Sequence, residues 1–323
     1  MTPDLFRELV AEASLSPNVH NIQPTLWRMV DANTVALVQS PTRHLPVGDP
    51  TGRDAAASHG AAAEGMIIAA SARGIALSVT VPESNEVARL RMTGTKPPDP
   101  LAPYLTQRRT YRGHFDKTAK TQARAAIQAL SRPDIRILSD DTDIARIARL
   151  TDQATMRAFR NRAYREELTS WMRLTSRHPD WHRDGLNAKA MNMPTPMALA
   201  AGAVLSWPLF EILDALKLAS PLTAEAAATQ SAAALIAFVK DRDADPFQTG
   251  RDWHRMWLEL TALGLSAGVL TILGDDAEAA ADMANRLLLS PDQRIVMVLR
   301  VGMVDAQRLP PPARLPVNEL ILP

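Results

Sequence analysis

The chain has 323 residues, 46% of them hydrophobic, which is enough to fill one large core or two moderate ones and excludes a disordered protein. Its 36 basic and 35 acidic side chains give a formal net charge of +1, so no long-range field draws it to nucleic acid or to an anionic membrane. Cysteine is absent, which excludes disulfides, thiolate metal ligands and thiol nucleophiles.

The first hundred residues predict a helix, a hairpin, a long helix and two strands. The N-terminus mixes charged and apolar residues and lacks the basic start and apolar core of a signal peptide, so we expect a cytoplasmic protein. The long helix is alanine-rich and apolar on most faces, which predicts a central position, and Gly74 ends it. These elements span residues 3–15, 26–30 with 34–38, 54–73, 75–81 and 87–92, followed by a proline-rich linker at 96–100.

The remainder predicts helices and strands on either side of an irregular segment at 178–221. The regular elements cover residues 120–130, 143–175, 232–239, 252–263 and 294–301, and an extended proline-rich tail covers 309–316. The uncharged run from Pro196 to Phe210 is shorter than the roughly 20 residues that a bilayer core requires, and Pro208 interrupts it. We expect a buried or lid-forming helix there, and no membrane span.

Two parts of the sequence repeat one another in order. Gly52-Arg53-Asp54 and Gly250-Arg251-Asp252 are predicted to open two central helices, which end at Gly74 and Gly264. Matching these two final glycines aligns three further pairs: Ala72 with Ala262, Ser71 with Thr261, and Met66 with Met256. Downstream, residues 90–94 echo residues 299–302. We interpret this order as a fused homodimer, in which a fold that once paired with itself does so within one chain.

Three arginines lie within the five residues from Arg108 to Arg112, between the two similar parts of the sequence. A guanidinium is permanently charged and carries five donors, so burying three of them requires an anion. A solvated basic loop is the alternative. The position of the cluster between two similar halves favours an anion site.

The motifs named above resemble those of the FMN-dependent nitroreductases. Residues 16–24, Ser-Pro-Asn-Val-His-Asn-Ile-Gln-Pro, resemble the loop of that family, and Arg108-Arg109-Thr110-Tyr111-Arg112 resembles its flavin-phosphate motif. Residues 250–271 resemble its central helix and the turn that follows. The duplication, Asp184-Gly185 and Arg314-Leu315-Pro316 are most similar to the Acg-like branch.

The resemblance implies an α+β, nitroreductase-like fold of two tandem halves in a monomeric pseudo-dimer. Each half would have a small mixed or antiparallel sheet packed with helices around a central helix. The first half would cover residues 1–100 and the second residues 101–323, with an inserted helical lid at about 178–221 that closes over the flavin. Because residues 1–100 contain no matching arginine triplet, we expect one FMN per chain.

The resemblance also assigns site residues. Arg108, Thr110 and Arg112 would grip the FMN phosphate, with Arg314 as a further ligand. The remaining cofactor-binding residues would be Pro17, Asn18, Asn21 and Gln23 from the first half, with Leu270 and Thr271 at the turn beside flavin N5. Two positions depart from the family pattern, because Thr25 replaces a tryptophan and Ala313 replaces a second arginine.

The function implied is an FMN oxidoreductase that passes electrons from NAD(P)H to a small planar nitro- or quinone-type acceptor. The alternative is a protein that sequesters FMN behind its lid without turnover. His20 is a further catalytic candidate, and the chemistry otherwise belongs to the flavin. His178 and His182 have the spacing of half a zinc site but lack the other ligands, so no metal is expected.

Overall fold

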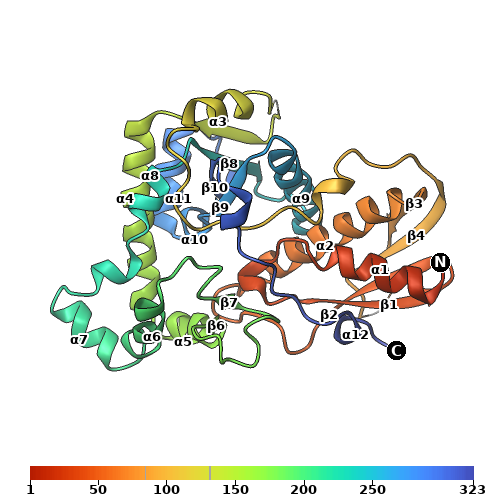
Figure 1. Cartoon of the computed structure of the whole chain (residues 1–323), viewed down its shortest axis with the longest axis horizontal. Coiled ribbons are helices and arrows are strands. Elements are labelled where there is room, and N and C mark those ends of the chain that lie inside the picture. The colour runs from red at the N-terminus through yellow and green to blue at the C-terminus, as the bar shows by residue number, and fades with distance from the viewer. Residues whose placement is uncertain (84, 131) are drawn as a thin grey trace.

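The computed structural model describes residues 1–83, 85–130 and 132–323, and it shows an α+β protein built on two four-stranded antiparallel sheets (Figure 1). The first sheet has the order β1-β2-β4-β3 and the second the order β5-β8-β10-β9. The strands of the first are Thr25–Asp31, Thr34–Gln39, Ile75–Thr80 and Ala88–Thr95 for β1 to β4. Those of the second are β5 (Ile135–Leu138), β8 (Ala234–Asp241), β9 (Ser266–Val269) and β10 (Gln293–Gly302).

The two sheets are connected in the same way. In each, a helix precedes the first strand, a long helix leads from the second strand to the edge strand, and the chain then returns to the third strand. The preceding helices are α1 (Pro3–Ala13) and α3 (Lys120–Ile127), and the long helices are α2 (Arg53–Ser71) and α9 (Pro246–Ala262). All six neighbouring strand pairs are antiparallel, as expected for sheets built from hairpins and short crossovers.

The long helices α2 and α9 cross at two glycines, where their backbones approach most closely. A Cβ atom on Gly60 would lie 1.8 Å from the carbonyl oxygen of Phe247, and one on Gly250 would lie 1.9 Å from that of Ala57. Side chains at either position would hold the helices apart. The two contacts are equivalent, because a shift of 190 residues turns Ala57 into Phe247 and Gly60 into Gly250.

A second pair of contacts obeys the same shift. His254 Nδ1 lies 2.7 Å from the carbonyl oxygen of Ala61, and Arg251 Nε donates to Glu64 at 2.9 Å. Residues 61 and 64 become residues 251 and 254 when 190 is added. Reciprocal contacts of this kind are the property of a two-fold interface, in which residue i meets residue j and j meets i.

The sequence register of the two helices needs one correction. We expected Gly250-Arg251-Asp252 to open the second central helix, but α9 begins at Pro246 and is capped by Asp245, whose carboxylate accepts hydrogen bonds from residues 247 and 248. Gly250 therefore lies inside the helix, and the residue that corresponds to it in α2 is Gly60 and not Gly52. The register set by Gly74 and Gly264 is the one that the contacts follow, and both glycines have positive φ at a helix end.

Helices cover both faces of the second sheet, whereas the hydrophobic core of the first sheet lies on one of its faces. Alternate residues of β8 point to α3 and α9 on one side and to α4 (Asp141–Arg160), α10 (Ile272–Asp275) and α11 (Ala277–Arg286) on the other. The first sheet packs against α1 and α2. The wider coverage is possible because about a hundred residues between β5 and β8 form an insertion.

The predicted helix over 143–175 is wrong at its centre, because two helices form there. Asn161 adopts an extended backbone and its side chain accepts a hydrogen bond from the N–H of Tyr164, so it ends α4 and caps α5. The insertion continues with a short parallel pair, β6 and β7. Its remaining elements are α5 (Arg162–Ser170), β6 (Met172–Arg173), β7 (Leu186–Asn187), α6 (Thr195–Val204), α7 (Leu209–Ala215) and α8 (Ala226–Gln230).

The uncharged run is not the single buried or lid helix that we expected. It breaks at Pro208 into α6 and α7, whose axes differ by 95°, and several of its apolar side chains are exposed. Among the described residues no single helix is long and apolar enough to cross a membrane, and this bent pair is the one combination that meets those criteria together.

The C-terminal tail leaves the second half and returns to the first. Residues 309–316 are extended, as predicted, and α12 (Val317–Leu320) then packs against α1 and β1. The N–H of Leu322 donates to the carbonyl oxygen of Trp27 at 2.7 Å. Four short 3-10 helices complete the chain: Val19–Asn21, Ala102–Tyr104, Ser220–Thr223 and Ala306–Arg308.

The glycine crossing gives a stability prediction. Gly60→Ala and Gly250→Ala should each lower the free energy of unfolding by about 1–3 kcal/mol or more, because the added methyl overlaps a backbone carbonyl that cannot rotate away. Gly202→Ala in α6 is the matched control, since a Cβ there meets only Leu174 at 3.4 Å, and it should leave stability unchanged or raise it. Thermal denaturation of the three variants tests this, and equal melting temperatures for all of them would contradict it.

Candidate functional site

A cavity of about 310 Å³ lies beside the helix crossing, at the lower end of the range of roughly 300–1,000 Å³ typical of ligand pockets. Segments far apart in the sequence form its walls. The first half contributes residues 15–21 and the first turns of α2, and the second contributes residues 108–112, α9, β10 and the turn after β9. Residues 185–190 of the insertion and the tail 310–314 close the remaining sides.

Arg108 is the most unusual group in this cavity. Its side chain is 4% exposed and lies over the ring of Trp257, with Cζ 4.6 Å from the ring centroid. Nη2 donates to the carbonyl oxygen of Leu15 at 2.9 Å, but Nε and Nη1 are buried without a hydrogen-bond partner among the described residues. Burial, with Arg314 and Arg109 nearby, lowers the pKa of Arg108 well below its ordinary value. The site thus holds a buried cation with two donors that bind no described residue.

Three further arginines line the same cavity. Burial lowers the pKa of Arg109 and of Arg112, and burial with Arg109 nearby lowers that of Arg314 to about 10. Within the described residues, no carboxylate forms an ion pair with any of these arginines. Arg108 is buried and the other three arginines are half-buried, so four cations around one space form a positively charged wall that a bound anion would neutralise.

Arg314 differs from Arg108 in that protein groups already occupy its donors. Nε donates to the carbonyl oxygen of Ser14 at 2.5 Å, Nη1 to Asn21 Oδ1 at 2.7 Å, and Nη2 to the carbonyl oxygens of Leu15 and Ser16 at 3.1 and 3.2 Å. The tail arginine therefore fastens the loop after α1. It contributes charge to the cavity more than free hydrogen bonds.

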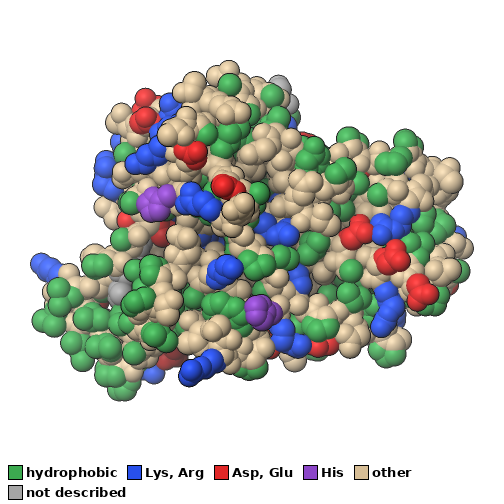
Figure 2. Space-filling view, viewed as in Figure 1, with side chains coloured by type: hydrophobic (Ala, Val, Ile, Leu, Met, Phe, Trp, Pro, Cys, Tyr) green, Lys and Arg blue, Asp and Glu red, His purple; other side chains and the backbone are tan. Residues whose placement is uncertain are grey.

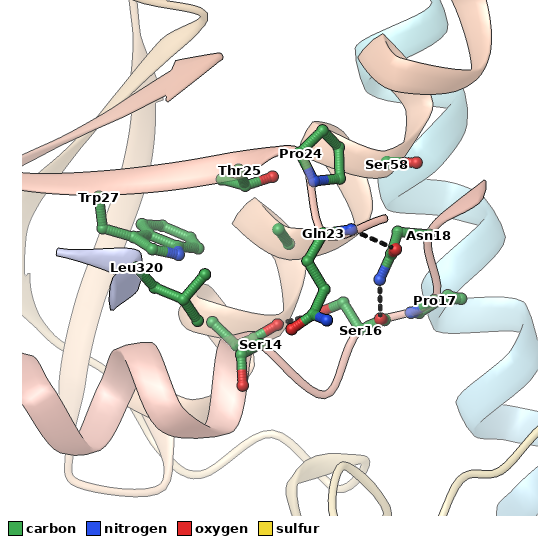
Figure 3. Close-up of a pocket in the computed structure, with 12 residues that line it drawn as sticks. Ser14, Ser16, Pro17, Asn18, Gln23, Pro24, Thr25, Trp27, Ser58 and Leu320 are labelled. Carbon is green, nitrogen blue, oxygen red and sulfur yellow. Dashed lines mark hydrogen bonds between the residues drawn. The ribbon is translucent and has the colours of Figure 1, made fainter. Parts of the chain in front are cut away.

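The side-chain amides of residues 16–24 also bind the protein itself. Asn18 Oδ1 accepts from the N–H of Gln23 at 2.9 Å and Asn18 Nδ2 donates to the carbonyl oxygen of Ser16 at 3.2 Å (Figure 3). Gln23 accepts from the N–H of Leu315 and donates to the carbonyl oxygen of Arg183. Figure 3 shows these amides around a second, much smaller cavity of about 20 Å³, which is large enough for one water molecule.

This loop concentrates backbone strain. His20, Asn21 and Gln23 have φ values of 43°, 56° and 53°, in the left-handed region that residues other than glycine rarely adopt. Strain of this kind persists where surrounding contacts impose it, and it gathers at functional sites. Burial, with Arg112 nearby, lowers the pKa of His20 to about 4, so the imidazole is neutral at physiological pH.

A segment of the insertion, residues 183–190, crosses the cavity as a strap. Asn21 and Gly185 exchange hydrogen bonds, Asn21 Nδ2 to the Gly185 carbonyl oxygen and Gly185 N–H to the Asn21 carbonyl oxygen, each at 3.1 Å. Asp184 is buried and anchors the strap through Arg173 at 2.7 Å and Arg43 at 2.9 Å. Of the predicted lid at 178–221, the described residues that contribute to the cavity wall lie between 185 and 190, and none of them belongs to α6 or α7.

Segment 108–112 is held by the edge of the second sheet. The N–H of Tyr111 donates to the carbonyl oxygen of Ala267 at 2.8 Å, and Thr110 forms an isolated parallel bridge with Ala267. A Cβ on Gly268 would lie 2.3 Å from the carbonyl oxygen of Tyr111, so glycine allows this approach. Arg300, fully buried in β10, donates to the carbonyl oxygen of Arg112 at 2.7 Å. These contacts point the segment into the cavity.

The structure brings nine of the predicted site residues to the cavity and leaves two outside it. The lining residues are Pro17, Asn18, His20, Asn21, Arg108, Thr110, Arg112, Thr271 and Arg314. Gln23 lines the second, smaller cavity instead, and Leu270 is buried in the core. The N–H of Leu270 donates to the carbonyl oxygen of Val298 at 2.8 Å, so it does not face the cavity.

Sequence reasoning missed several lining residues. Trp253 and Trp257 are not among the predicted site residues, yet both line the cavity as well as being buried, with ring centroids 5.0 Å apart. Their spacing of four residues on α9 carried no information about which helix face meets the cavity. Arg109 was within the quoted motif but was not singled out. His178 and His182 belong to no metal-binding group among the described residues.

Two carboxyl groups in the cavity were also missed. Asp54, in the first turn of α2, and Asp275, at the end of α10, both line it. Desolvation, followed by the charges of Asp54 and Asp49, raises the pKa of Asp275 to about 7, against the opposing charges of Arg53 and Arg294. Desolvation and Asp49 likewise raise the pKa of Asp54 to about 6. Nothing in the sequence marks two aspartates that are 221 residues apart as neighbours.

Comparison with known proteins gives matches among solved structures only. No protein-family model and no curated protein matches the chain. The FMN- and NADPH-dependent nitroreductase NfnB from sphigopyxis sp. strain HMH is 18% identical with a TM-score of 0.35, over 69% of this chain and 97% of that chain. NfnB from Mycobacterium smegmatis, in complex with NADPH, is 13% identical with a TM-score of 0.34, over 65% and 91%. A nitroreductase with bound FMN from Bacteroides fragilis is 12% identical with a TM-score of 0.31, over 64% and 89%.

The contributions of the adjacent residues Asp275 and Asp276 to stability should change with pH in opposite directions. The raised pKa of Asp275 means that its contribution to stability is present below the unfolded pKa, about 4, and is lost as pH rises through about 7. Hydrogen bonds from Arg157 lower the pKa of Asp276, so its contribution is present above the unfolded pKa and lost in acid. Asp275→Asn should therefore raise the melting temperature at pH 8, with a smaller gain at pH 5, whereas Asp276→Asn should lower it at pH 8. Melting curves across this range check both signs, and the same sign for both variants at pH 8 would contradict the assignment.

Proposed function

We propose that the protein is an FMN-dependent oxidoreductase that binds one FMN in this cavity, with the phosphate on the arginine cluster. The observation that carries the proposal is Arg108, whose Nε and Nη1 are buried and unpartnered at the cavity wall. A dianionic phosphate accepts bidentate hydrogen bonds from a guanidinium and removes the charge deficit in one step. The choice of FMN among phosphate-bearing ligands rests on the loop motif at 16–24 and the motif at 108–112.

The residues present divide into those with free donors and those that shape the wall. Arg108, Arg109, Thr110 and Arg112 would hold the phosphate and the adjoining ribityl chain. The flavin ring would lie against Pro17, Asn18, Asn21 and Thr271. Arg314 would hold the loop at 16–24 in place. Bound FMN would supply the transfer of hydride and electrons, while the protein supplies position, charge and exclusion of water.

We also infer that the chain is a fused pair of nitroreductase-like halves, at 1–100 and 101–323, and acts as a monomer. The reciprocal contacts between α2 and α9 and the common strand order support this. The tail crosses the boundary, since Leu315 and Leu320 pack in the core of the first sheet. The first half has no arginine triplet, which supports one flavin per chain.

Sequestration of FMN without turnover is the second candidate function, and the strap favours it. Asp184 is 4% exposed and holds the strap through two arginines, and the next residue, Gly185, exchanges a pair of hydrogen bonds with Asn21. A strap fastened so firmly would slow the entry of NAD(P)H and of a planar nitro- or quinone-type acceptor.

Arg108→Met tests the phosphate assignment, because it keeps the apolar contact with Trp257 and removes the charge. FMN affinity should fall by roughly ten- to a hundredfold, since hydrogen bonds to charged groups contribute about 1.5–3 kcal/mol. The melting temperature of the FMN-free variant should rise, because an unneutralised buried cation is gone. Fluorescence titration with FMN and thermal melts measure the two effects. A fall in stability with unchanged FMN affinity would show that Arg108 is structural.

An anaerobic titration with NADPH distinguishes the two functions. Loss of the flavin absorbance band on adding NADPH supports the oxidoreductase, and a band that persists supports sequestration. Asp184→Asn should loosen the strap by weakening both of its ion pairs, and should make reduction at least several-fold faster if the strap limits entry. Arg146→Gln, at an exposed ion pair on α4, is the control and should leave the rate unchanged.

A further inference from the structure

The insertion presents an apolar surface that the flavin proposal does not use. Within residues 195–218, six large apolar side chains are each more than half exposed: Met197, Leu199, Trp207, Ile212, Leu216 and Leu218. Figure 2 shows apolar side chains gathered at the lower left of the molecule, where Figure 1 places α6 and α7. Contiguous apolar surface of this kind marks an interaction site in soluble proteins.

The segment of residues 195–218, called the helical hairpin below, is firmly packed on its inner side. The exposure of its apolar side chains is therefore not due to poor attachment. Phe210 and Leu205 are buried in a small core with Met156 of α4. Arg165 is 1% exposed, lies over the ring of Phe210 with Cζ 4.0 Å from the centroid, and binds Glu211. The exposed face is therefore held outward on a rigid support.

The charges around the face fit an anionic surface. Each nearby carboxylate is already in an ion pair: Glu211 with Arg165, Asp214 with Arg160, and Glu166 with Arg162. Arg162 also lies over the exposed ring of Trp207, with Cζ 5.0 Å from the centroid. Lys217 is exposed at the end of α7 and forms no ion pair with a described residue. Exposed Trp, Leu and Lys side chains within one short segment are typical of a segment that lies in the membrane interface.

The helix lengths decide between spanning a bilayer and lying on it. The 10 residues of α6 extend about 15 Å and the 7 of α7 about 10 Å, against a hydrocarbon core of about 30 Å, and the two axes differ by 95°. We propose that α6 and α7 dock the protein on the headgroup region of an anionic lipid bilayer. This inference goes beyond the flavin function and does not depend on it. Docking differs from the membrane span that the sequence argued against.

Vesicle sedimentation of the full chain tests the proposal. The protein should sediment with phosphatidylcholine vesicles that contain one third phosphatidylglycerol, and less with pure phosphatidylcholine. Tryptophan fluorescence should shift to the blue on binding, because Trp207 is 59% exposed, and the variant Trp207→Phe should lose this shift, which separates it from the other five tryptophans. The triple variant Leu199→Gln, Ile212→Gln, Leu216→Gln should lose binding by at least about tenfold, because each side chain contributes apolar area. Lys217→Gln should weaken binding to the anionic vesicles alone.

Val81→Gln with Leu288→Gln is the matched control, since these side chains are 84% and 90% exposed outside the helical hairpin, and it should bind as the wild type does. Light scattering measures self-association of each form. Absence of wild-type binding to both vesicles would overturn the proposal, and so would equal loss in the control variant. A wild-type dimer that the triple variant converts to a monomer, without vesicle binding, would assign the face to a second copy of the chain instead.

Discussion

The close crossing of α2 and α9 is the constraint on which the rest of the structure depends. Gly60 and Gly250 let the two backbones meet at distances that no side chain would allow. As a result, the loop after α1 from the first half faces Trp253 and Trp257 from the second, and the cavity forms between them. A wider crossing would separate the two walls. The cavity therefore depends on the contact between two helices that pack against different sheets.

The second organising feature is electrostatic. Four arginines converge on the cavity. The groups that accept hydrogen bonds from Arg108 and Arg314 are mainly backbone carbonyl oxygens, where carboxylates would be usual. A carbonyl satisfies a donor but does not cancel a charge, so the folded state without an anion keeps a net repulsion at its centre. This gives ligand binding and stability a common origin, since one phosphate would satisfy Arg108 and relieve the cluster at once.

The insertion between β5 and β8 does three things that the first half lacks. Its helix α4 covers the second face of the sheet, its strap closes the cavity, and its helical hairpin presents an apolar face to the outside. Arg43 binds the strap through Asp184, and the residue just before the strap, His182, accepts a hydrogen bond from the N–H of Arg314 in the tail. Movement of the strap would therefore disturb both the loop at 16–24 and the C-terminal segment.

The sequence by itself determined the elements whose signals are local. The hairpin around residues 31–33, the helix ended by Gly74 and the extended proline tail all follow from periodicity, turn residues and φ restrictions, and all are present in the structure. The motif at 108–112 predicted an anion site because arginine charge is a property of the residue and not of its surroundings. The break at Asn161 was missed because one capping side chain interrupts an otherwise continuous helical pattern.

Only the tertiary structure decided which donors are free. Arg108 and Arg314 have the same chemistry in the sequence, yet one has two unpartnered nitrogens and the other donates to five protein acceptors, because the tail happens to cross the carbonyl end of the loop. Asp54 and Asp275 acquired raised pKa values by a meeting of elements 221 residues apart. The sequence determines which side chains can carry a charge. Whether a charge is neutralised depends on distances between residues that are far apart in the sequence, and these are set by packing.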